Sequence, residues 1–102
     1  MTMKTTFKEE NGFNVMYFDG RLDTAAAPET DKAMQPLLES DGKDIILDCT
    51  GLEYISSSGL RIFLNILKNA KGKGSHVFIR GVNEPIQKVF KMTGFYNLFE
   101  IM

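Results

Sequence analysis

The sequence contains few of the residues that usually carry covalent or metal chemistry. Among its 102 residues there is one cysteine, Cys49, and one histidine, His76. A single cysteine cannot form an intrachain disulfide, which favours a reducing compartment. Because cysteines and histidines do not cluster at metal-ligand spacing, we expect neither a metal site nor a cofactor. We expect Cys49 to be a small core residue, since it follows an apolar run.

The chain also lacks a surplus of charge and a long apolar run. Twelve Lys and Arg residues stand against thirteen Asp and Glu residues, which gives a net charge of −1. This balance leaves no electrostatic excess to hold a nucleic-acid backbone. No stretch approaches the roughly 20 apolar residues that a membrane span needs. These absences predict a cytoplasmic protein that neither inserts into a membrane nor binds nucleic acid directly.

The length fits one domain, residues 1–102, with a substantial core. Two β-rich runs, residues 5–8 and 13–18, flank Asn11-Gly12, a strong signal for an antiparallel hairpin. Apolar periodicity and turn residues then predict the order β-β-α-β-α-β-α-β, an α/β fold with a mixed sheet and helices packed on it. We expect helices over residues 25–39, 58–71 and 84–92, further strands over residues 44–48, 76–80 and 98–101, and a turn at Asp41-Gly42-Lys43.

Two details of this prediction concern individual elements. Pro36 should disturb the last turn of the first helix, because proline cannot donate a backbone hydrogen bond. The continuous apolar run at residues 45–47 suits a central strand that is covered on both faces.

Three consecutive serines follow the strand at residues 44–48 and open the next helix: Ser56, Ser57 and Ser58. A hydroxyl in the first turn of a helix lies near backbone N–H groups that lack intrahelical partners, and these groups favour a phosphate. The segment therefore suggests a modification switch. The spacing alone equally allows Ser56 and Ser58 to be N-cap residues and Ser57 to be a loop hydroxyl.

Three segments of the chain share motifs with one known family. Gly20-Arg21-Leu22-Asp23 followed by Ala27-Pro28-Glu29 is similar to a Gly-x-Leu-Asp…Ala-Pro opening. Residues 48–60 resemble the signature Asp-x-(Ser/Thr)-x-(Leu/Val)-x-x-(Ile/Met)-(Asp/Ser)-Ser-(Ser/Ala)-Gly-Leu, and residues 89–99 are similar to a closing helix and strand. Over essentially its whole length the chain thus resembles STAS domains, the family named for sulphate transporters and anti-sigma factor antagonists.

The resemblance implies a regulatory protein without catalysis of its own. Free-standing bacterial members are anti-sigma factor antagonists, which bind an anti-sigma factor that is also a serine kinase and lose this binding when phosphorylated. The implied partners are this kinase and a serine phosphatase. The motif places the phosphoacceptor on Ser57, and many members carry Asp where this chain has Ser56. Since the predicted helix starts at Ser58, we expect Ser58 to be its cap.

The resemblance also implies a partner surface beside the phosphoacceptor. It comprises Asp23, Thr24, Ser56, Ser57, Ser58, Gly59, Leu60, Arg61, Ile62 and Asn65. Other readings of these residues stay open. Asp23 and Thr24 could cap the first helix, Arg61 and Asn65 could form a solvated stripe, and Ile62 could be ordinary core.

Two other functions also stay open. A STAS domain can be a docking subunit of a transport or signalling assembly, with the same surface and no phosphate. A serine hydrolase would need a base, for which only His76 is available, and the serine segment lacks the Gly-x-Ser-x-Gly elbow. Asp48 is better explained as a structural acid that ends a strand and binds loop N–H groups than as a general base.

Overall fold

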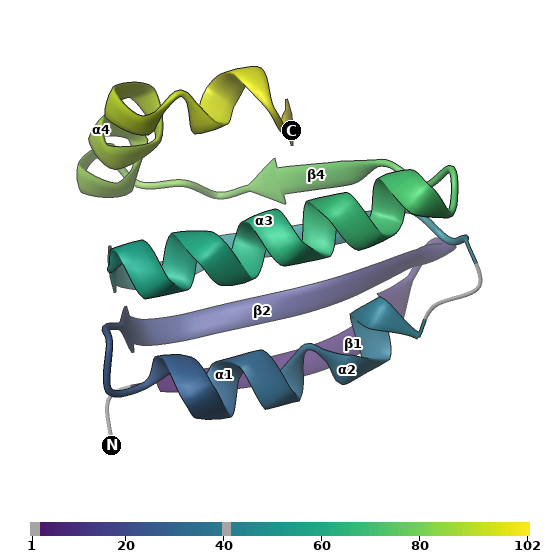
Figure 1. The fold of residues 1–102 in the computed structure, drawn as a ribbon, viewed down its shortest axis with the longest axis horizontal. Coiled ribbons are helices and arrows are strands. Elements are labelled where there is room, and N and C mark those ends of the chain that lie inside the picture. The colour runs from purple at the N-terminus through teal and green to yellow at the C-terminus, as the bar shows by residue number, and fades with distance from the viewer. Residues whose placement is uncertain (1–2, 40–41) are drawn as a thin grey trace.

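The computed structural model describes residues 3–39 and 42–102 (Figure 1). The strands are β1 Met3–Glu10, β2 Phe13–Leu22, β3 Ile45–Ile55, β4 Val77–Arg80 and β5 Glu100–Ile101. The helices are α1 Ala27–Ala33, α2 Gln35–Leu38, α3 Ser57–Gly72 and α4 Glu84–Thr93, with a 3-10 turn, η1, at Phe95–Asn97. The predicted α/β class and the predicted alternation of strands and helices are confirmed. The predicted turn at residues 41–43 includes Asp41, which lies outside the described residues.

The hairpin forms where Asn-Gly predicted it. Asn11 and Gly12 both have positive φ, at 52° and 84°, as a tight two-residue turn between twisted strands requires. Glu10 therefore lies opposite Phe13, and β1 pairs with β2 in antiparallel register. The register brings Phe7 beside Met16 on the side that faces the core.

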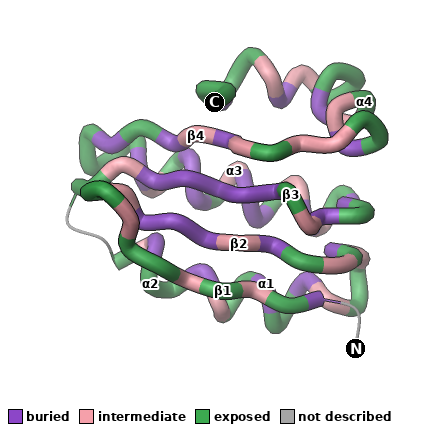
Figure 2. The backbone as a smooth tube through the Cα atoms, turned by 180° about the vertical axis from the view of Figure 1, so that it is seen from behind, coloured by how far each residue is buried: buried purple, intermediate pink, exposed green. Residues whose placement is uncertain are grey.

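The sheet has the strand order β1-β2-β3-β4-β5, and the pairs from β2 onward are parallel. Helices α1, α2 and α3 lie on one face, and the opposite face of the sheet is seen uncovered in the reverse view (Figure 2). The prediction that β3 would be covered on both faces is therefore wrong in one respect, since helices cover only one face of the strand. Ile46 faces the uncovered side but is only 3% exposed, because Val15 and Phe78 flank it in register.

The first predicted helix, residues 25–39, is two helices separated at Met34. Pro36 has no N–H, and its ring would clash with the carbonyl oxygen four residues earlier. It cannot continue α1 and instead occupies an early position of α2, where a missing N–H costs nothing. The break at Met34 thus comes two residues before Pro36, just ahead of the turn in which it was predicted. Within the described part of the chain, no helix combines the length and apolar character needed to cross a membrane.

β3 is longer than predicted, and this matters for the site. The chain after Asp48 continues to pair with β2 as far as Ile55, with register irregularities near Asp19 and Gly20. Such bulges strengthen the twist and re-aim the chain at the end of a strand. The last strand is shorter than predicted, because the N–H groups of Leu98 and Phe99 both donate to the Phe95 carbonyl oxygen and continue the turn that η1 begins.

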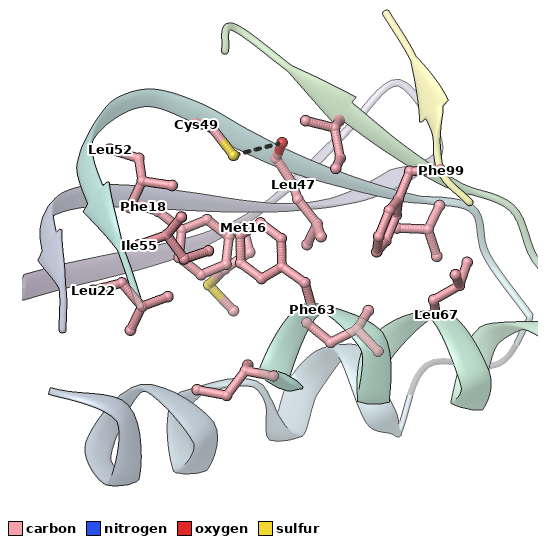
Figure 3. Close-up of a cluster of buried hydrophobic side chains, with 14 of the residues drawn as sticks. Met16, Phe18, Leu22, Leu47, Cys49, Leu52, Ile55, Phe63, Leu67 and Phe99 are labelled. Atoms are coloured by element: carbon pink, nitrogen blue, oxygen red, sulfur yellow. Dashed lines mark hydrogen bonds between the residues drawn. The ribbon is translucent and has the colours of Figure 1, made fainter. Parts of the chain in front are cut away.

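The core lies between the sheet and α3 (Figure 3). The rings of Phe18 on β2 and Phe63 on α3 are 5.0 Å apart between centroids, and both side chains are buried. Leu22 and Ile55, at the ends of β2 and β3, are buried in the same cluster. Cys49 is fully buried, and burial raises the pKa of its thiol, so the expected structural role is confirmed.

Candidate partner-binding site

The ends of β2 and β3 fix the position of the site. Leu22 and Ile55 are paired in register, and the N–H of Ser56 donates to the Leu22 carbonyl oxygen at 2.8 Å. The loop after β2 and the serine segment after β3 therefore leave the sheet side by side. Both α1 and α3 begin at this end of the sheet, on the left in Figure 1.

Ser56 is the N-cap of α3. Its backbone is extended, with φ −89° and ψ 172°, and its hydroxyl oxygen accepts a hydrogen bond from the Gly59 N–H at 3.2 Å. Its carbonyl oxygen accepts from the Leu60 N–H at 2.9 Å. The prediction that Ser58 caps the helix is wrong by two residues, and α3 begins at Ser57 rather than at Ser58.

Ser57 and Ser58 occupy the first two helical positions. Ser57 is exposed and Ser58 is half-buried, whereas Ser56 is only 8% exposed. Since Ser56 engages the N–H groups of Gly59 and Leu60, the other two N–H groups of the first turn are those of Ser57 and Ser58. An exposed hydroxyl thus stands beside two donors of a helix N-terminus.

Gly59 allows α3 to approach the ends of both strands. A Cβ at this position would lie 2.7 Å from Cγ of Leu22 and 2.8 Å from Cγ1 of Ile55. Gly59 is itself buried, as is Ser56. These two members of the predicted partner surface therefore position the others and offer little surface of their own.

The loop after β2 contributes Asp23 and Thr24. One carboxylate oxygen of Asp23 accepts a hydrogen bond from the Ala26 N–H at 2.9 Å. Ala26 is the N-cap residue of α1, and its own side chain makes no capping hydrogen bond. Asp23 therefore stabilises the turn that leads into α1, as one of the open readings held. Thr24 is exposed.

Five predicted partner residues meet in a groove between α1 and α3 with a volume of about 330 Å³. We call it the α1–α3 groove. It is lined by Thr24, Ala27, Pro28, Asp31, Ser58, Arg61, Ile62 and Asn65. Ile62 is 5% exposed and forms part of its floor, so it belongs both to the core and to the groove. Leu60 is half-buried against the core and does not line the groove.

Three lining residues were missed in the sequence: Ala27, Pro28 and Asp31. The signal was present, because residues 27, 28 and 31 recur at helical spacing and share one face of a helix. What the spacing could not show was that this face of α1 turns toward α3.

Asp48 lies apart from the groove, on the uncovered face of the sheet. Its carboxylate accepts hydrogen bonds from the Thr50 N–H at 2.9 Å and from Arg80 Nε at 2.8 Å. Burial by itself would raise the pKa of Asp48, but these hydrogen bonds and the Arg80 charge outweigh it and hold the pKa below its usual value. A carboxylate held ionised in this way is a structural acid, although it does not end its strand.

His76 lies at the opposite end of the sheet from the serines. It directly precedes β4, whose Val77 pairs with Ile45 at the start of β3, whereas Ser56 follows the end of β3 (Figure 1). Eleven residues of β3 separate the two ends, about 30 Å at the usual rise per residue. The His76 ring instead lies 2.7 Å from a carboxylate oxygen of Glu100. It cannot serve as the base of a serine hydrolase at Ser57.

The fold defines an α/β protein with helices on one face of a mixed sheet and a serine-capped helix at the carboxyl end of its parallel strands. The STAS domain family model matches residues 4–102, and the chain belongs to this family. It is 26% identical over 101 residues to an anti-sigma-B factor antagonist of Staphylococcus aureus, an alignment that covers 99% of this chain and 92% of the relative.

Solved structures share the fold. An anti-sigma factor antagonist from Mycobacterium paratuberculosis has a TM-score of 0.82 at 22% identity, covering 98% of this chain and 85% of that one. SpoIIAA of Bacillus in its phosphorylated form has a TM-score of 0.72 at 16% identity, covering 97% and 91%. The unphosphorylated form of SpoIIAA gives 0.73 at the same identity, covering 97% and 87%.

Proposed function

We propose that this protein is an anti-sigma factor antagonist that binds a serine-kinase anti-sigma factor and is switched off by phosphorylation at Ser57. The observation that carries the proposal is the exposure of Ser57 at the first position of α3, next to a groove-lining residue, Ser58. The family membership and the names of the relatives support the same function. A serine phosphatase that restores the unphosphorylated form completes the cycle.

The helix start makes a phosphate compatible with the fold. A phosphoserine adds about −1.5 to −2 charges at pH 7, and the positive end of a helix dipole favours such a charge. The N–H groups of Ser57 and Ser58 are not engaged by the Ser56 cap, so they are the donors available to the phosphate. The fold is also the same in two solved forms of SpoIIAA, one of them phosphorylated.

The cost of the phosphate falls on the complex. If the surface around Ser57 packs against the anti-sigma factor, a dianion there must lose water and faces groups that were arranged around a neutral hydroxyl. A loss of about 1.4 kcal/mol already weakens binding tenfold. One modification can therefore dissociate the complex while the antagonist itself stays folded.

The test compares three substitutions at Ser57 in binding to anti-sigma factor kinases encoded in the same genome. Ser57→Ala should bind as the unmodified protein does and resist the kinase with ATP. Ser57→Asp should lose binding about tenfold or more, whereas Ser57→Asn, which has the same shape without the charge, should lose much less. Mass spectrometry after incubation with kinase and ATP should locate the phosphate on Ser57.

Two outcomes would contradict the proposal. Phosphate on Thr50 with Ser57 unmodified would exclude the site, since Thr50 is also exposed. Equal binding by the Ser57→Asp and Ser57→Asn variants would exclude a charge-based switch and favour the unregulated docking subunit instead.

A further inference from the structure

The α1–α3 groove has an apolar floor between two walls of opposite charge. Ala27 and Ile62 are buried at its floor, while Asp31 on α1 and Arg61 on α3 are exposed at its rim. Among residues 3–39 and 42–102, neither Asp31 nor Arg61 forms a salt bridge. The groove thus presents one acidic and one basic group on either side of an apolar surface, and both groups are available to a binding partner.

The size and lining of the groove favour a protein side chain over a metabolite. A volume of about 330 Å³ is at the lower end of the range of about 300–1,000 Å³ that small-molecule sites occupy, and among the described residues no aromatic side chain lines it. A short segment that carries one aliphatic side chain between two charged ones would satisfy the floor and both rim charges.

The groove is also placed to be affected by the switch. Ser58 lines it, and Ser57 lies four residues before Arg61 on α3, the spacing at which helical side chains are neighbours. A phosphate on Ser57 would therefore compete for the Arg61 guanidinium with any carboxylate of the bound partner. The segment that occupies the groove is the part of the partner that phosphorylation would displace first.

We propose that the α1–α3 groove receives an aliphatic side chain of the anti-sigma factor, flanked by a carboxylate that pairs with Arg61 and by a Lys or Arg that pairs with Asp31. This inference rests on the proposed function, because it names the contact through which that partner is held. It adds Asp31 to the partner surface and gives Ile62 a direct role as the floor on which the anchor packs.

Charge reversals with matched controls test the pairing. Arg61→Glu and Asp31→Lys should each weaken binding of the purified anti-sigma factor about tenfold or more. Lys68→Glu on α3 and Glu29→Lys on α1 make the same charge changes at exposed positions outside the groove. They should change binding by about twofold or less.

The double variant Asp31→Lys with Arg61→Glu keeps the natural net charge but inverts the pattern across the groove. It should bind no better than the weaker single variant. Full recovery of binding in the double variant would show that only net charge matters and would overturn the pairing.

A methyl group reports on the floor without any substitution. On addition of the anti-sigma factor, the δ1-methyl NMR signal of Ile62 should shift at the same concentrations at which binding occurs, while that of Ile79, buried in β4, stays in place. A complex that forms with an unmoved Ile62 signal and unaffected charge reversals overturns the groove, yet leaves the Ser57 switch standing. An Ile62 signal that shifts with the concentration of the antagonist alone indicates self-association and also overturns it. Failure of the wild-type protein to bind any such kinase would instead refute the proposed function.

Discussion

Gly59 is the position at which the structure makes its sharpest prediction. The Cβ of an alanine there would come within 2.7 Å of Cγ of Leu22 and 2.8 Å of Cγ1 of Ile55. The Leu22 contact is to a branched carbon and the Ile55 contact is to a methylene carbon, and both atoms lie one bond beyond Cβ rather than at the mobile ends of the side chains. Leu22 and Ile55 are 0% and 4% exposed, so neither has free space to move into. Either α3 must shift away from the strands or the strand ends must move.

The magnitude follows from two opposing terms. Overpacking a filled core costs typically about 1–3 kcal/mol, and contacts this short belong to the upper part of that range. Alanine in place of glycine within a helix returns up to about 1 kcal/mol through helix propensity. Gly59→Ala should therefore destabilise the protein by about 1–2 kcal/mol. For a domain of this size the melting temperature should fall by about 5–15 °C.

Gly72→Ala is the matched control, because it makes the same chemical change at the other end of the same helix. Apart from its chain neighbours and the backbone of its own helix, no atom of the described residues lies within 4 Å of a Cβ built at Gly72. This variant should be as stable as the wild type or more stable, by up to about 1 kcal/mol. Urea unfolding followed by circular dichroism measures both variants. A Gly59→Ala protein at least as stable as Gly72→Ala would refute the account of how α3 is held against the strand ends.

Two further predictions concern the helix cap Ser56 and the structural acid Asp48. Ser56→Ala should lower the free energy of unfolding by about 1 kcal/mol, because the helix cap is lost. Ser56→Asp can accept the same hydrogen bond from the Gly59 N–H and should keep most of the wild-type stability. Equal losses of stability in the two variants, measured by urea unfolding, would contradict the capping role. Asp48 has its pKa held below the usual 3.8, so its ionised form stabilises the fold above that pH, and this contribution disappears as pH falls through the lower folded-state value. Asp48→Asn should therefore be less stable than the wild type at pH 7 and should lose less stability on acidification between about pH 5 and pH 2. Unfolding at a series of pH values measures both effects. If the variant loses as much stability on acidification as the wild type, Asp48 is not the source of this pH dependence.

Local signals predicted the parts of the fold that local chemistry decides. Asn11-Gly12 forms its hairpin because few other residue pairs tolerate two positive φ angles in succession. Helix α4 begins at Glu84 as predicted and ends at Thr93, one residue later than predicted. Its ends are set locally, since Asn83 accepts from the Ile86 N–H and Gly94 adopts the left-handed conformation.

The errors occur where tertiary contacts decide between locally equal choices. Each of three adjacent serines is a good N-cap, and the choice depends on the end of β3, which pairing of Ser56 with Leu22 fixes. The extension of β3 through Gly51 has the same cause, because bulged pairing with β2 is invisible in the strand's own sequence. The groove could not be predicted from local sequence either, because its walls come from two helices, α1 and α3. The core beneath these helices sets their relative placement.

The role of Ser56 bears on how the family signature should be interpreted. The resemblance that places the switch on Ser57 has one discrepancy, a serine at position 56 where many members carry aspartate. In the structure Ser56 is 8% exposed, and its hydroxyl oxygen accepts a hydrogen bond from the Gly59 N–H. Serine and aspartate are about equally good N-cap residues. The position therefore selects for a short side chain with an acceptor oxygen, and a negative charge is not what it requires. The exposed hydroxyl of the next residue, Ser57, is the same in either case, so the serine at position 56 does not count against phosphorylation of its neighbour.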